Sequence, residues 1–98
     1  MKYEKSSDGK KLNVKLIGEI NAINIAEIEE NLLKEVEGVT DLTFDMSELE
    51  YLSSSGLRML LQMQKMMKTQ GSMVITNANA DIMEIFRVTG FVKWLKFA

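Results

Sequence analysis

The apolar residues of this chain follow two spacings in turn, and this change of spacing limits the folds that are open to it. Apolar residues first alternate with polar ones, as in a half-buried strand, at Leu12, Val14 and Leu16. Beyond Gly18 they recur every three or four positions, as one face of a helix requires, at Ile25, Ile28, Leu32 and Val36. Strands that are followed by helices favour an α/β domain with parallel crossovers.

The same spacings and the turn residues predict the remaining elements. Residues 2–5 form a first strand that pairs with 12–17 across a turn at 6–9. Asn24 is expected to cap the first helix, and Gly38 to end it. The later elements are a strand at 41–45, a loop or short turn at 47–52, a helix from Ser54 to about Thr69, a strand at 74–76, a helix from Asn79 to Gly90 and a last strand at 91–97. We expect one domain over residues 1–98, with the order β-β-α-β-α-β-α-β in a mixed sheet.

The composition excludes several kinds of chemistry. The chain has no cysteine and no histidine, so disulfides, thiolate catalysis and the usual zinc ligands are missing, and we expect no metal and no cofactor. The 12 basic and 14 acidic residues are spread along the chain, which argues against a nucleic-acid partner. No apolar run approaches the roughly 20 residues that span a bilayer, and residues 1–15 hold no signal-peptide core. We therefore expect a cytoplasmic protein with no membrane association.

Three consecutive serines and a glycine stand directly before the second predicted helix, at Ser53, Ser54, Ser55 and Gly56. One reading is that Ser53 or Ser54 caps the helix, because serine is a favoured N-cap residue. The other reading is that one hydroxyl accepts a phosphoryl group, whose negative charge the helix amides tolerate and a docking partner feels. The spacing alone does not separate these two readings.

Three short motifs carry a resemblance to a known family. The serine cluster, from Tyr51 to Leu57, resembles the motif of bacterial anti-sigma factor antagonists, usually aspartate, serine, serine or threonine, glycine, leucine. Gly18, Glu19 and Ile20 resemble the turn before the first helix of that family, and Thr89, Gly90 and Phe91 resemble the turn after its third. The resemblance covers nearly the whole chain. It implies a STAS-like mixed sheet with helices packed against it.

The resemblance also implies a phosphoswitch. A partner that is both a serine kinase, with a histidine-kinase-like ATPase fold, and an anti-sigma factor binds the unmodified antagonist, phosphorylates it and releases it. The acceptor implied by the motif is Ser54, and the partner surface is expected at Asn21, Ser53, Ser55, Gly56, Arg58 and Met59. The chain departs from the family pattern at Ser53 and Asn21, where an aspartate is usual. We expect a monomer or a weak dimer.

Two other functions stay open from the residues. A STAS scaffold or small-ligand sensor would bind without being phosphorylated. A small serine hydrolase would need a general base, and none is found in the sequence. Binding is therefore expected rather than catalysis.

Arg58 follows Ser54 by one helical turn, so it is a candidate to pair with a phosphate, to meet an acidic group of a partner, or to remain solvated.

Overall fold

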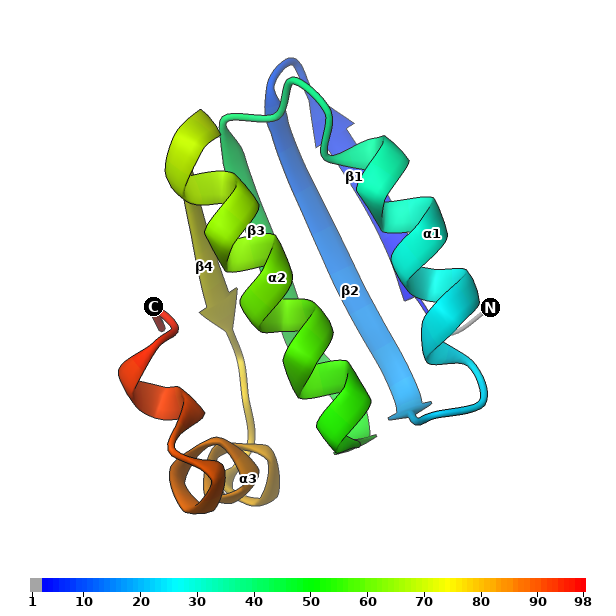
Figure 1. The fold of residues 1–98 in the computed structure, drawn as a ribbon, viewed down its shortest axis with the longest axis vertical. Coiled ribbons are helices and arrows are strands. Elements are labelled where there is room, and N and C mark those ends of the chain that lie inside the picture. The colour runs from blue at the N-terminus through cyan, green and yellow to red at the C-terminus, as the bar shows by residue number, and fades with distance from the viewer. Residues whose placement is uncertain (1–2) are drawn as a thin grey trace.

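A four-stranded mixed sheet forms the centre of the structure, a computed structural model that describes residues 3–98 (Figure 1). Strand β1 (Tyr3–Asp8) runs antiparallel to β2 (Lys11–Ile20), whereas β3 (Asp41–Leu52) and β4 (Ser72–Thr76) continue the sheet in parallel. Helix α1 (Ile25–Glu35) connects β2 to β3, and helix α2 (Ser54–Gln70) connects β3 to β4. The predicted α/β class with parallel crossovers is confirmed.

The hydrophobic core lies between the sheet and the two long helices. In β2 the predicted alternation buries Leu12, Val14 and Leu16, and in α1 the predicted stripe buries Ile25, Ile28 and Leu32. Figure 1 shows α1 and α2 side by side over the same face of the sheet. The other face of the sheet carries polar side chains such as Asn13 and Thr43, so α1 and α2 cover only one of its two faces.

Strand β3 is much longer than predicted, because residues 47–52 continue it instead of forming a loop. The pairing with β2 shifts twice, between Lys15 and Ile17 and between Gly18 and Glu19, and each shift adds one residue to β3. These bulges bring both Leu49 and Leu52 to the core although they are spaced by three residues. Apolar residues three positions apart do not show the period of two that indicates a strand. The prediction of a loop at 47–52 was wrong for this reason.

Both ends of the chain also differ from the prediction. The first strand extends to Asp8, so the turn is at Gly9 and Lys10 and not at 6–9; Lys2, where the strand was expected to begin, lies outside the described residues. The predicted last strand at 91–97 is mostly absent. It is replaced by a short 3₁₀ helix, η1 (Phe91–Lys93), and by a single bridge between Phe97 and Ile75 of β4.

The third helix, α3 (Ala80–Thr89), lies at the lower end of the sheet in Figure 1. Its predicted start and end are confirmed. The Asn79 side chain accepts a hydrogen bond from the Ile82 amide at 2.9 Å, and Gly90 adopts the left-handed conformation with φ of 81°. Phe86 of this helix is buried and packs edge-on against Phe97, with 5.2 Å between ring centroids.

Candidate functional site

The carboxyl ends of the parallel strands β2 and β3 bring two connections together at the lower end of the sheet in Figure 1. One is the loop of residues 21–24 that leads into α1, and the other is the direct passage from β3 into α2. The Ser53 amide donates to the Ile20 carbonyl at 2.8 Å, so the end of β2 is fastened to the start of α2. Ligands and partners of α/β sheets commonly bind at this end of the strands.

The three serines of the cluster have different roles in the structure. Ser53 is the N-cap of α2, with its Oγ accepting from the Gly56 amide at 3.2 Å, and it also shares a hydrogen bond with the Ser55 Oγ at 2.8 Å. Ser54 is exposed, and within residues 3–98 its hydroxyl has no hydrogen-bond partner. The capping reading therefore belongs to Ser53, and Ser54 is the member of the cluster whose hydroxyl is free.

Gly56 lets the first turn of α2 approach the sheet closely. A Cβ atom at this position would lie 2.5 Å from the Leu52 Cδ1 and 3.2 Å from the Ile20 Cγ2. Both are buried side chains at the ends of β3 and β2. Gly56, expected to be part of the partner surface, is itself buried, and its visible role is to seat the helix start against the strands.

Two asparagines fix the loop between β2 and α1. The Asn21 Oδ1 accepts from the amides of Ile23 at 2.9 Å and Asn24 at 3.2 Å, as an N-cap residue would. Asn24 was predicted to cap α1, but its Oδ1 accepts from the Asn21 amide at 2.9 Å and its Nδ2 donates to the Glu19 carbonyl at 2.8 Å. Its side chain therefore turns back to the loop, because the preceding turn has already placed Asn24 in helical conformation.

Arg58 lies on the exposed side of α2, next to a groove between α1 and α2 with a volume of about 500 Å³. Glu29 and Glu30 of α1 line the same groove, together with Ser55. The guanidinium therefore has carboxylates across the groove and the helix start one turn below. No ion pair joins Arg58 to either acid in the described part of the chain.

Met59 does not belong to an accessible surface. Its side chain is 1% exposed and forms part of the core, so its expected contact with a partner is wrong. The bulges of β3 and the packing of α2 against both the sheet and α1 widen the buried face of the helix beyond the stripe through Leu57 and Leu60. Met63 is likewise buried, and Met66 is partly buried against the core.

Two acidic side chains of β3, Glu48 and Asp45, form hydrogen bonds away from the serine cluster. Glu48 forms an ion pair with Lys15 at 2.9 Å, and this hydrogen bond raises the pKa of Lys15. Burial alone would raise the pKa of Asp45, but hydrogen bonds from the Ser47 amide and the Asn77 side chain outweigh it and lower that pKa.

Within residues 3–98 no three acidic side chains are grouped as a metal site would require, and no helix there is long and apolar enough to cross a membrane.

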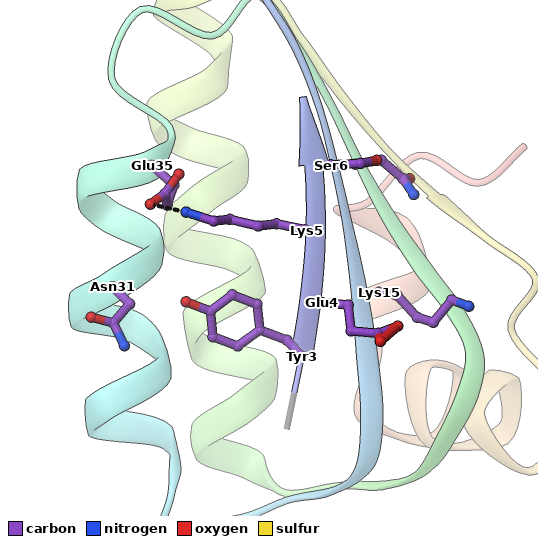
Figure 2. Close-up of a pocket in the computed structure, with 8 residues that line it drawn as sticks. Tyr3, Glu4, Lys5, Ser6, Lys15, Asn31 and Glu35 are labelled. Carbon is purple, nitrogen blue, oxygen red and sulfur yellow. Dashed lines mark hydrogen bonds and ion pairs between the residues drawn. The ribbon is translucent and has the colours of Figure 1, made fainter. Parts of the chain in front are cut away.

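A second cleft lies away from the serines, at the β1 edge of the sheet. It has a volume of about 800 Å³ and is lined by residues of β1, β2 and α1. Figure 2 shows Tyr3 and Lys5 directed toward Asn31 and Glu35 of α1, with an ion pair between Lys5 and Glu35. The cleft is open to solvent, and none of the predicted site residues lines it.

The sequence pattern of the STAS domain matches residues 3–98. The chain belongs to the STAS domain family. It is 32% identical over 79 residues to a putative anti-sigma factor antagonist, BtrV, of Bordetella bronchiseptica, covering 79% of this chain and 68% of that protein. It is 29% identical over 80 residues to the anti-sigma-B factor antagonist of Bacillus subtilis, covering 81% of this chain and 73% of that protein.

Solved structures agree with this assignment at the level of the fold. An anti-sigma factor antagonist from Mycobacterium paratuberculosis superposes with a TM-score of 0.86 at 19% identity, over 97% of this chain and 82% of the other. The phosphorylated form of the Bacillus cell fate determinant SpoIIAA superposes with a TM-score of 0.76 at 17% identity, over 98% and 90%. The predicted STAS-like fold is confirmed.

The sequence did not reveal what Asn21 and Ile23 do in this STAS domain. Asn21 was singled out as a partner contact, whereas the structure gives its side chain the task of closing the loop. Ile23 was not singled out at all, although it is the most exposed large apolar residue within residues 3–98. One signal was present: Ile23 lies two residues before Ile25, out of phase with the buried stripe of α1.

Proposed function

We propose that this STAS domain is an anti-sigma factor antagonist that works by partner switching in the cytoplasm. It binds an anti-sigma factor serine kinase while Ser54 is unmodified, and it is released after phosphorylation. The kinase transfers the γ-phosphoryl group of ATP to the Ser54 Oγ, the hydroxyl loses its proton, and ADP is the second product. The domain itself acts as a substrate and a binding module.

The free, exposed hydroxyl of Ser54 is the observation that carries this proposal. Its neighbours Ser53 and Ser55 hold each other, so a kinase can remove the Ser54 proton without breaking the helix cap. The new phosphate would stand at the amino end of α2, where the partial positive charge of the helix tolerates an anion. Phosphorylation can therefore change the surface without unfolding it.

The two departures from the family pattern are compatible with this role. Ser53 caps α2 as an aspartate would, since both side chains are favoured N-cap acceptors. Asn21 supplies through its Oδ1 the acceptor that an aspartate carboxylate would supply to the same two amides. Both replacements keep the local hydrogen bonds and remove a negative charge from the docking surface.

The proposal is tested with ATP and the histidine-kinase-like ATPases encoded in the same genome. We expect one of them to add a single phosphate to the parent and to Ser55→Ala, but none to Ser54→Ala, as read by intact mass and peptide mapping. Ser55→Ala is the matched control, because its hydroxyl is adjacent and already engaged. Phosphate on Ser54→Ala, or no labelling by any of these ATPases, would contradict the proposal.

Binding measurements complete the test. Ser54→Ala should bind the kinase like the parent and resist release by ATP, whereas Ser54→Asp should weaken binding by at least about tenfold through an unpaired buried charge. Tight binding of the parent without any phosphate transfer would instead favour the STAS scaffold or ligand sensor. Isothermal titration calorimetry with and without ATP distinguishes these outcomes.

A further inference from the structure

The loop of residues 21–24, which we call the asparagine loop, is held in one conformation by its own hydrogen bonds. Side-chain bonds from Asn21 and Asn24 close it at four points, with distances of 2.8 to 3.2 Å. The Ile25 amide also donates to the Asn21 carbonyl at 3.0 Å. A loop with this many internal bonds has little conformational freedom left to lose when a partner binds.

This rigid loop presents an apolar side chain to solvent. Ile23 is 92% exposed, more than Trp94 at 63%. Its side chain does not join the buried stripe of α1, so the core gains nothing from it. Isoleucine is branched at Cβ and has few rotamers, which lowers the entropy cost of fixing it at an interface.

Ile23 and Ser54 lie at the same end of the sheet. The hydrogen bond from the Ser53 amide to the Ile20 carbonyl ties the strand before the asparagine loop to the residue before Ser54. Figure 1 shows the loop into α1 and the first turn of α2 both following the lower ends of β2 and β3. A protein that covers the Ser54 hydroxyl therefore approaches Ile23 as well.

The asparagine loop and the three serines present uncharged side chains. Asn21, Ser53, Ser54 and Ser55 carry no formal charge, and Ile23 is the large apolar group among them. Arg58, one helical turn beyond Ser54, is available for an ion pair with a partner, but the two neighbours of the acceptor are neutral hydroxyls. Binding energy at the loop itself must come from removing apolar area from water, and interface energy is usually concentrated in a few apolar anchors.

We propose that Ile23 is an apolar anchor that fills a hydrophobic pocket on the kinase that phosphorylates Ser54. This inference rests on the proposed function and names the side chain that sets the affinity of docking. Ile23 acts in binding alone, since phosphoryl transfer takes place at Ser54. The asparagine loop is the positioning element, because it holds Ile23 in the exposed conformation before the kinase arrives.

The test is a graded series at position 23, measured with the ATPase that labels Ser54 of the parent. Ile23→Val, Ile23→Ala and Ile23→Asp should raise the dissociation constant in that order, with Ile23→Ala weakening binding by about tenfold or more. The KM for the antagonist should rise in parallel while kcat stays unchanged, as expected for a uniform binding contact. Trp94→Ala is the control, since Trp94 is an exposed large apolar residue that follows η1, outside the asparagine loop and the serine cluster, and should leave both constants unchanged.

A double-mutant cycle separates positioning from direct contact. If Asn21 acts by holding Ile23, then Asn21→Ala should weaken binding in the parent and have little further effect in Ile23→Ala. Melting temperatures of Ile23→Ala and the parent should agree, because so exposed a side chain adds little to stability.

The outcomes test the anchor at Ile23 separately from the phosphoswitch at Ser54. Parent-like affinity and KM for Ile23→Ala and Ile23→Asp, with Ser54 still labelled, would overturn the anchor and leave the phosphoswitch standing. Absence of any labelling of Ser54 would overturn the phosphoswitch and the anchor together. A fall in kcat with no change in KM would also contradict a role in docking.

Discussion

The lower end of the sheet and the β1 edge are both open to solvent, yet they are built in opposite ways. The β1 edge has a hollow of about 800 Å³, across which one exposed ion pair joins Lys5 of β1 to Glu35 of α1. At the lower end, backbone amides and short side chains interlock around Ser54, from the Ser53 cap to the asparagine loop. The two regions therefore differ in their side-chain hydrogen bonds, which are concentrated at the end of the sheet that we propose for docking and not around the hollow at the β1 edge.

The close contact at Gly56 provides the strongest test of that rigidity. Gly56→Ala places a Cβ 2.5 Å from the buried Leu52 Cδ1, and overpacking of this kind costs about 1–3 kcal/mol. The better helix propensity of alanine returns up to about 1 kcal/mol, so a net loss of up to about 2 kcal/mol is expected. Urea denaturation measures the free energy of unfolding.

A rescue variant checks the cause of this loss. Leu52→Val removes the atom that the new Cβ would meet, so the double variant should lose less than the sum of the two single changes. Strict additivity, or a Gly56→Ala variant as stable as the parent, would show that the helix start is not tightly seated.

The next largest effect separates two adjacent serines. Ser53→Ala removes the N-cap of α2 and should cost about 1 kcal/mol, whereas Ser54→Ala removes a free hydroxyl and should change stability by less than about 0.5 kcal/mol. Thermal and urea denaturation of both variants measure the difference. Equal losses at the two positions would mean that the hydroxyls share the capping role.

A smaller effect is expected in the asparagine loop. Asn21→Ala removes the acceptor of two amide hydrogen bonds at a partly exposed position and should cost about 0.5–1 kcal/mol. Asn21→Asp keeps an acceptor and should be at least as stable as the parent. Loss of stability in Asn21→Asp equal to that in Asn21→Ala would show that the Oδ1 contacts do not hold the loop.

The smallest effect is expected at the β1 edge. Lys5→Gln removes the ion pair with Glu35, and exposed pairs contribute roughly 0.2–1 kcal/mol, so the loss should stay below that of Ser53→Ala. The loss should be smaller still in 0.5 M salt, because salt screens exposed charges. The Debye length is already down to ~10 Å at about one fifth of that ionic strength. A larger loss than that of Ser53→Ala would reverse the comparison of the two regions.

Much of this fold could be predicted from the sequence, and the failures have a common cause. The stripes at Leu12 to Leu16 and at Ile25 to Leu32 were readable because each face follows one period. Residues 47–52 were not, since bulges break the period of two while pairing with β2 continues. Met59 was misplaced because the burial of α2 depends on α1 as well as on the sheet.

By itself, the sequence determined the class of the fold, the position of the second helix start and the serines among which we propose a phosphate acceptor. Local periodicity and capping preference carry that information, because they act between residues close in the chain. Only the tertiary structure decided that β3 continues to Leu52, that Gly56 seats α2 against Leu52 and Ile20, and that the serines and the loop with Ile23 come to the same end of the sheet. Those facts depend on how β2, β3 and α2 meet, which no local pattern encodes.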